Sequence, residues 1–203
     1  EYRKVGINDT NYATAQYEMA LSYMGMEEYK TAQDVLKELL EFDLRYDFEH
    51  RVYSLLGSAY DDNEETDKAL ETYSEGIRRF PMQHNLYFNR GVTYERLKEY
   101  DKALADYQQA IQCNMYHANS HLRLGLLVAN EGKYTQATLS LMTFLLLEPT
   151  DSRAPSVVSI LEKMADGELE EEPKNIATLQ DNYEELNLFY KNQIALQKSY
   201  KVK

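Results

Sequence analysis

Small and large apolar residues recur along the chain at positions that predict repeated pairs of helices. Four small residues are each followed three positions later by a large apolar side chain, in the pairs Ala20/Tyr23, Gly57/Tyr60, Gly91/Tyr94 and Gly125/Val128. An alanine lies twelve positions after each small residue, at Ala32, Ala69, Ala103 and Ala137. Successive copies are 37, 34 and 34 residues apart in both sets, so two kinds of position share one register. A fixed spacing of this length indicates a repeat architecture.

Further columns divide each copy into two helices. Nine residues after each small residue come Tyr29, Thr66, Tyr100 and Tyr134, and the second helices of the last three copies are predicted to begin there. Sixteen residues after each small residue come Leu36, Tyr73, Tyr107 and Leu141. Turns are predicted at 25–28, 61–64, 97–99 and 130–132. The small residues let two antiparallel helices approach closely, and each hairpin buries its apolar face only by stacking on its neighbours. With 8 Gly and 4 Pro in 203 residues, the chain is predicted to be all-α.

These columns resemble the tetratricopeptide repeat family, whose unit of about 34 residues is a helix–turn–helix. The resemblance implies a right-handed superhelix of stacked antiparallel helix pairs, with a C-terminal capping helix and a long terminal helix. Gln16 and His121 occupy a column that is usually aromatic, so these two copies depart from the pattern. The predicted segments are an N-terminal flank (1–12), four repeats (13–46, 50–83, 84–117 and 118–151), a capping helix (152–165), an acidic linker (166–174) and a long helix (175–203).

The resemblance also implies a binding surface, because the first helix of each repeat lines the concave side of such a superhelix. The inward positions carried over from the repeat register are Tyr17, Leu21, Ser54, Ser58, Asn85, Phe88, Asn89, Val92, Asn119, Leu122, Arg123 and Leu126. This groove is predicted to be largely apolar with a few amide and guanidinium groups, which can hold a peptide backbone or a carboxylate. The expected partner is therefore another protein, bound through a segment with hydrophobic anchors.

One subfamily holds the C-terminal carboxylate of chaperones with five residues, namely Lys and Asn, then Asn, then Lys and Arg. The matching positions here are Ser54, Ser58, Asn89, Asn119 and Arg123. Both lysines are missing, so we expect no clamp of this kind.

The residues after the repeats leave the role of the chain open between two alternatives. Ile176, Leu179, Tyr183, Leu186 and Tyr190 recur at steps of 3, 4, 3 and 4, which is typical of an amphipathic helix. This helix is expected to cover the repeats, to pair with a second copy into a homo-oligomer, or to support a further domain. The alternative to a binding scaffold is thus a structural or oligomerisation module, or the recruiting arm of a larger protein.

Charge, hydropathy and cysteine content indicate which partners and compartments the chain is compatible with. The chain has 34 acidic and 22 basic residues, a formal net charge of −12, and no cluster of Lys and Arg to hold a phosphate backbone. We therefore expect no nucleic-acid partner. No apolar run approaches the ~20 residues of a membrane span. Cys113 is alone, so localisation stays open between the cytoplasm and export without disulfides, with removal of an upstream piece as an open alternative.

Candidate catalytic and metal-binding residues give little support to an enzyme. His117 and His121 are spaced i, i+4, but the repeat register assigns His121 to the aromatic column and no third ligand is fixed nearby. The carboxylate pairs, such as Asp61/Asp62, are predicted to lie in turns, where burial or a charged neighbour rarely shifts their pKa. We therefore expect a non-enzymatic scaffold that needs no metal and no cofactor.

Overall fold

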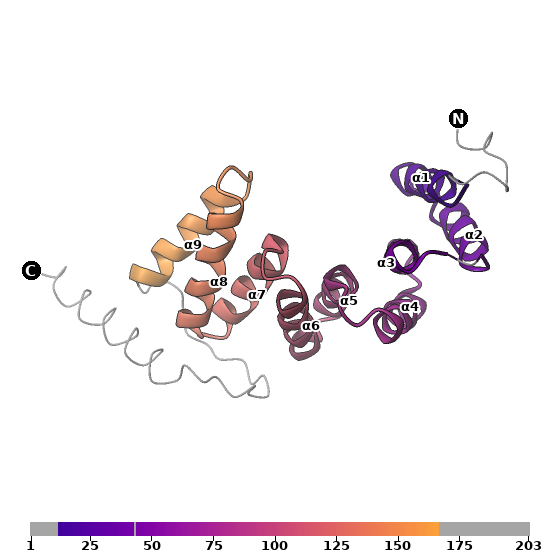
Figure 1. Cartoon of the computed structure of the whole chain (residues 1–203). Helices are drawn as coiled ribbons and strands as arrows, with labels where there is room; N and C mark the ends of the chain where they lie inside the picture. The colour runs from indigo at the N-terminus through magenta and orange to yellow at the C-terminus, as the bar shows by residue number, and fades with distance from the viewer. Residues whose placement is uncertain (1–11, 43, 167–203) are drawn as a thin grey trace, which may run out of the picture. The chain divides into compact units, whose positions relative to one another are not determined.

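The computed structural model describes residues 12–42 and 44–166, and within these ranges all regular structure is helical. The first compact unit contains α1 (Tyr12–Gly25), α2 (Tyr29–Leu40), α3 (Tyr46–Asp62), α4 (Thr66–Arg79) and α5 (His84–Arg96). The second contains α6 (Tyr100–Cys113), α7 (Ala118–Asn130), α8 (Tyr134–Leu147) and α9 (Ala154–Asp166). Figure 1 shows the helices of each unit following one another as successive hairpins. The all-α prediction is confirmed.

Within each unit, helices pack mainly against the helices next to them in sequence. In the first unit α1 packs on α2, α2 on α3, α3 on α4, and α4 on α5, while α1, α3 and α5 also make contacts from one first helix to the next. In the second unit α6 packs on α7, α7 on α8, and α8 on α9. The stacking of helix pairs is therefore observed in both units.

The repeat columns form the core of these hairpins. Ala20, Ala32, Ala69, Ala103 and Ala137 are fully buried, as are Leu36 and Leu141 from the column sixteen residues after the small residue. A Cβ atom placed on Gly57 would lie 2.3 Å from the Cε1 atom of Tyr73, and one on Gly125 would lie 2.7 Å from the Cγ atom of Leu141. In these two copies the small residue of the first helix therefore touches the residue sixteen positions later, in the second helix. This contact explains why the two sets of positions keep the same spacing.

The turn inside each hairpin contains one residue in the left-handed region of backbone space. These residues are Glu27, Glu64, Lys98 and Gly132, with φ values of 60°, 62°, 61° and 73°. After Glu27, Glu64 and Gly132 the next residue donates its backbone N–H to the carbonyl five positions earlier, as in Glu28 to Tyr23 at 2.9 Å and Glu65 to Tyr60 at 2.8 Å. This pairing ends the first helix in a Schellman-type cap. Second helices then begin at Thr66, Tyr100 and Tyr134, as predicted.

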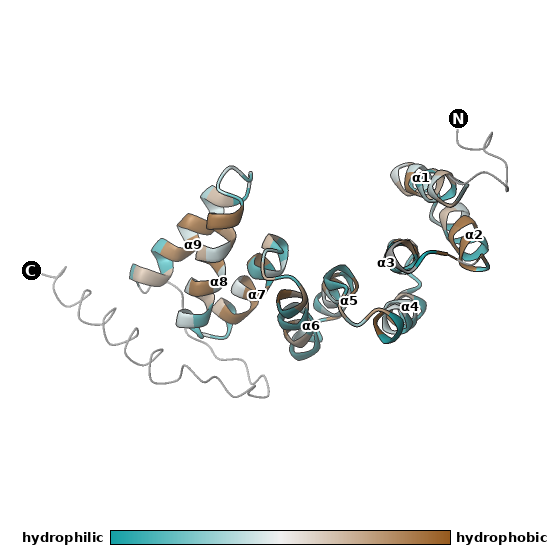
Figure 2. Ribbon diagram, in the orientation of Figure 1, coloured by the Kyte–Doolittle hydropathy of each residue, from teal (hydrophilic) through white to brown (hydrophobic). Residues whose placement is uncertain are grey.

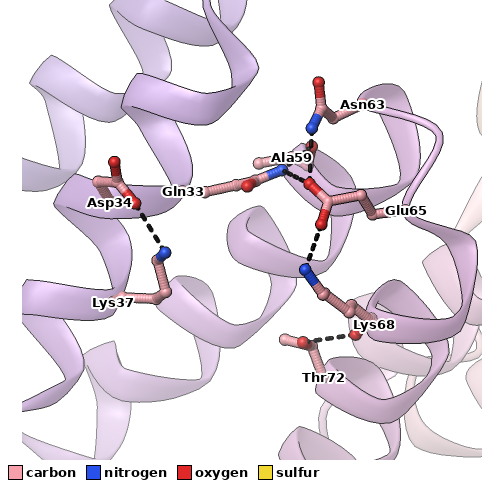
Figure 3. A network of polar contacts seen from close by, with 8 residues as sticks. All are labelled: Gln33, Asp34, Lys37, Ala59, Asn63, Glu65, Lys68 and Thr72. Carbon is pink, nitrogen blue, oxygen red and sulfur yellow. Dashed lines mark hydrogen bonds and ion pairs between the residues drawn. The ribbon is translucent and has the colours of Figure 1, made fainter.

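A polar network holds the second helix of the first hairpin against the second hairpin (Figure 3). The amide of Gln33 on α2 donates 3.1 Å hydrogen bonds to the carbonyl of Ala59 and to Oε1 of Glu65. Asn63 donates to the same oxygen at 2.6 Å, and Lys68 pairs with the other carboxylate oxygen. These partners, Lys68 first, lower the pKa of Glu65 from its ordinary 4.5 to about 2. The carboxylate is therefore ionised over the whole neutral and mildly acidic range.

Several predictions about segments are not tested by the described residues. The predicted flank at 1–12 (apart from Tyr12), the linker (apart from Asp166) and the long helix 175–203 lie outside them. The helix α9 lies in the segment predicted as a capping helix, and α3 begins at Tyr46, before residue 50, where the second repeat was predicted to start. The repeat boundaries and the handedness of the superhelix stay predictions.

Candidate partner-binding surface

In the first unit, α3 and α5 are the first helices of two successive repeats, and they face each other with matching polar stripes. The stripe on α3 is Ser54, Ser58 and Asp61, and the stripe on α5 is Asn89, Thr93 and Arg96. Both stripes have steps of 4 and 3, which places their members on one face of a helix, at successive turns. We call these six residues the α3–α5 polar seam.

The N-terminal part of the seam contains three of the predicted groove residues, which contact one another. The side-chain amide of Asn89 donates to Oγ of Ser54 at 3.0 Å and reaches Oγ of Ser58 at 3.5 Å. Ser58 in turn donates to the backbone carbonyl of Ser54 at 3.2 Å, and the hydroxyl of Tyr73 lies 3.1 Å from its Oγ atom. Asn89 is half-buried, and its side-chain carbonyl accepts no hydrogen bond from any residue between 12 and 166 that the structure describes. The amide is thus held in place with one acceptor unused.

At the C-terminal end of the seam, Asp61 lies in a helix, so the prediction that it lies in a turn is wrong. Asp61 is in the last turn of α3 and is 8% exposed. Its carboxylate accepts a 3.0 Å hydrogen bond from the hydroxyl of Thr93 and pairs with the guanidinium of Arg96. An acidic pair within a run of turn-forming residues gave no sign of this burial. The burial could have been inferred from the polar residues that recur at the same helical spacing in α3 and α5.

A second group of side chains lies where α1 meets α3. The Tyr17 ring packs edge-on against Phe48 with centroids 5.5 Å apart. The guanidinium of Arg51 lies 4.7 Å from the centre of the Tyr17 ring and 5.5 Å from that of Phe48. Sequence reasoning predicted Tyr17 but not the other two, because both fall near the lengthened connection between the first two repeats.

The remaining predicted residues of the first unit differ in exposure. Leu21 and Asn85 are exposed, whereas Phe88 and Val92 are half-buried. None of these four takes part in the hydrogen bonds of the seam. The structure therefore brings together Ser54, Ser58 and Asn89, and it joins Tyr17 to a separate aromatic group.

In the second unit the predicted residues all lie on α7. Leu122 is only 4% exposed and belongs to the core, whereas Arg123 and Leu126 are half-buried. The side-chain oxygen of Asn119 accepts a 2.9 Å hydrogen bond from Arg153, just before α9. Arg153 is itself paired with Asp151, and this pairing lowers the pKa of Asp151 to about 2. An intramolecular partner thus already occupies the oxygen of Asn119.

The two histidines spaced i, i+4 each contact a different protein group. Nδ1 of His117 lies 2.7 Å from Oγ of Ser120, and Nε2 of His121 lies 2.9 Å from the carbonyl oxygen of Met115. Among residues 12–42 and 44–166 no three His, Cys, Asp or Glu side chains are grouped so that they could hold a metal ion. Nor does this part of the chain contain a helix with the length and apolarity needed to cross a bilayer.

Family models of the tetratricopeptide repeat match residues 14–42 and residues 54–118. The chain contains tetratricopeptide repeats. No curated protein sequence matches it significantly. Its fold is similar to that in a crystal structure of MamA, with a TM-score of 0.59 and 23% identity over 73% of this chain and 85% of that one.

Two further proteins with a similar fold are peptide-binding proteins. The first repeat domain of Spaghetti (RPAP3), bound to the HSP90 peptide SRMEEVD, has a TM-score of 0.53 and 26% identity over 57% of this chain and 93% of that one. YrrB, described as having an unusual peptide-binding site, has a TM-score of 0.56 and 20% identity over 74% of this chain and 76% of that one. The family and the fold together support a protein–protein interaction scaffold.

Proposed function

We propose that the chain binds an extended segment of a partner protein on its first helices, with Asn89 as the main polar contact. The observation that carries this proposal is the hydrogen bonding of Asn89, whose amide nitrogen is directed to Ser54 and Ser58. Its free carbonyl can accept a hydrogen bond from a peptide N–H, and it needs no reorganisation to do so. A group that is already ordered loses little conformational entropy on binding.

The surroundings of Asn89 indicate what kind of segment fits. Phe88 and Val92 are half-buried on the same helix and offer apolar contact to a hydrophobic anchor. The net charge of −12 favours a basic or neutral partner, because long-range repulsion slows the approach of an acidic one. The proposed ligand is therefore an extended, non-acidic peptide with at least one large apolar side chain. We further propose that the chain has no catalytic activity of its own.

The experiment is a selection of binding peptides from a displayed random library, followed by affinity measurement with variants. For the selected peptides, Asn89→Ala should weaken binding about tenfold, which corresponds to the loss of roughly one hydrogen bond of 1–1.5 kcal/mol. Asn130→Ala, at the exposed end of α7, is the matched control and should leave the affinity unchanged. Selected peptides that bind the wild-type chain and Asn89→Ala equally well would show that the proposal is wrong.

Binding of the peptide SRMEEVD is a second test of the proposed function. Ser54 and Ser58 occupy two of the positions assigned to the chaperone clamp, and neither brings a positive charge to an acidic tail. We expect this peptide to bind no better than a scrambled peptide of the same composition. Tight, sequence-dependent binding would indicate a carboxylate clamp instead.

A further inference from the structure

The outer face of α8 differs from the same face of the other second helices. Leu139, Met142 and Leu146 are spaced i, i+3 and i+7, so they lie along one side of the helix. They are 54%, 51% and 80% exposed. We call them the α8 apolar strip. Figure 2 shows the hydrophobic colour spread over α8, whereas α4 is largely hydrophilic.

The chain itself provides the comparison, because the repeat register gives the equivalent positions in α2, α4 and α6. These are Asp34, Lys37 and Glu41, the residue that caps the end of α2; Glu71, Ser74 and Arg78; and Ala105, Gln108 and Gln112. Eight of these nine residues are polar or charged, which is the usual composition of a helix face that meets water. The helix α8 has no charged residue over its whole length. Large apolar side chains gathered on an exposed face usually mark a surface that another element covers.

We propose that residues 176–190 of the same chain dock on the α8 apolar strip as an amphipathic helix. Their apolar residues recur at steps of 3, 4, 3 and 4, which gives a stripe of the kind that packs lengthwise on another helix. An isolated helix of this length is marginal in water and needs such a surface.

The distance along the chain allows this docking. The helix α9 packs on α8 and ends at Asp166, so the following residues start beside α8. The nine residues 167–175 span up to about 30 Å when extended. The 14 residues of α8 are only about 21 Å long. Residue 176 can therefore reach either end of the strip.

The tether favours this segment over a second copy or a foreign protein. A segment joined by a short linker has an effective concentration in the millimolar range near its binding surface. The predicted first-helix surface is a poorer match, because several of its residues are polar and already hydrogen-bonded, such as Ser54, Asn89 and Asn119. Docking on α8 would leave that surface open, so this inference goes beyond the proposed binding function.

The test is hydrogen exchange of the full chain followed by mass spectrometry. The amides of residues 176–190 should exchange about tenfold or more slowly than an unstructured reference peptide of the same sequence. The variant Met142→Gln/Leu146→Gln gives α8 the same residues that α6 has at these positions, Gln108 and Gln112. It should remove the slow exchange at 176–190 and leave exchange in α7 unchanged.

Two controls keep the result interpretable. Glu71→Gln/Arg78→Gln places two glutamines on the same face of α4, at the positions equivalent to Leu139 and Leu146, and should leave exchange at 176–190 as it is in the wild type. The reciprocal variant Leu179→Gln/Leu186→Gln should speed exchange at 176–190 without altering α7, even if the α8 variant folds poorly. Fast exchange at 176–190 in the wild type, or slow exchange that survives both variants, would overturn the proposal. So would protection that grows with protein concentration, which would indicate a second copy.

Discussion

At the scale of single residues, Gly57 shows how a missing side chain sets the distance between two helices. Its Cα atom lies so close to the Tyr73 ring that a Cβ atom would come within 2.3 to 2.7 Å of three ring atoms. Tyr73 is 1% exposed and its hydroxyl contacts Ser58, so the ring has little freedom to move away.

We predict that Gly57→Ala destabilises the chain by about 1–3 kcal/mol, because overpacking outweighs the better helix propensity of alanine. Gly25→Ala is the matched control, since a Cβ atom on Gly25 meets nothing within 4 Å. The control should be neutral or stabilising by up to about 1 kcal/mol. Urea denaturation followed by circular dichroism measures both. Equal effects of the two substitutions would contradict the close approach at Gly57.

Glu65 determines a second residue-scale property, the response of stability to acid. Its pKa is lowered to about 2 in the folded chain, so its contribution is fully present above about pH 4.5 and is lost as the pH falls towards 2. We predict that Glu65→Gln lowers the free energy of unfolding at pH 7, and that this deficit shrinks as the pH falls from 4.5 to 2. Denaturation at pH 7, 5, 4 and 3 measures the trend.

The control for this titration is Glu71→Gln on the exposed side of α4. Glu71 makes no hydrogen bond or ion pair with any residue in the described ranges, so its replacement should lower the free energy of unfolding at pH 7 by less than Glu65→Gln does. A deficit for Glu65→Gln that stays constant down to pH 3 would mean that the Lys68, Asn63 and Gln33 contacts do not act on the carboxylate charge.

At the scale of elements, the hairpin turns all use a left-handed residue, but only Gly132 is glycine. A non-glycine residue in this region costs about 1–2 kcal/mol, so Glu27, Glu64 and Lys98 are each under strain. We predict that Glu64→Gly stabilises the chain by about 0.5–1 kcal/mol, since relief of strain exceeds the added entropy of the unfolded state. Gly132→Ala should destabilise it by about 1–2 kcal/mol. Thermal melts of both variants measure the effects, and shifts of the same sign would contradict the assignment.

The elements were largely predictable because repeat columns report packing that recurs. The two columns keep a fixed separation in sequence because their residues touch, as Gly57 does with Tyr73 and Gly125 with Leu141, and this spacing revealed the helix pairs. The predicted starts at Thr66, Tyr100 and Tyr134 agree with α4, α6 and α8. The start of α3 was not predictable, because the connection before it is lengthened and has no counterpart in the other repeats.

The candidate site was less predictable, because its contacts occur once rather than in every repeat. The register correctly placed Ser54, Ser58 and Asn89 on first helices, but it contained no information on the hydrogen bonds between them. It also missed Asp61, whose burial depends on Thr93 and Arg96 from a different repeat. A residue whose role depends on one particular neighbour does not recur in the other repeats, so the repeat pattern does not reveal it.

At the scale of the whole molecule, the excess of acidic residues has a measurable effect on stability. A net charge of −12 repels itself more strongly in the compact state than in the unfolded chain, and salt screens this repulsion. We predict that raising NaCl from about 10 to 150 mM increases the melting temperature at pH 7. At pH 4.8, near the isoelectric point, the same addition should have no effect or lower it, because attractive pairs such as Arg79 with Glu49 are then the main charges screened. A decrease at pH 7 would contradict the prediction.

The packing of each helix on its neighbours in sequence has a consequence for how the protein forms during synthesis. Among residues 12–42 and 44–166, the main helix–helix contacts join elements one or two places apart, and side-chain hydrogen bonds such as those of Asn89 with Ser54 and Arg96 with Asp61 join residues 35 positions apart. Chains with such local contacts fold quickly, since little loop closure precedes each favourable contact. A hairpin leaving the ribosome therefore finds its stabilising partners in the next hairpin to emerge, without waiting for the rest of the chain.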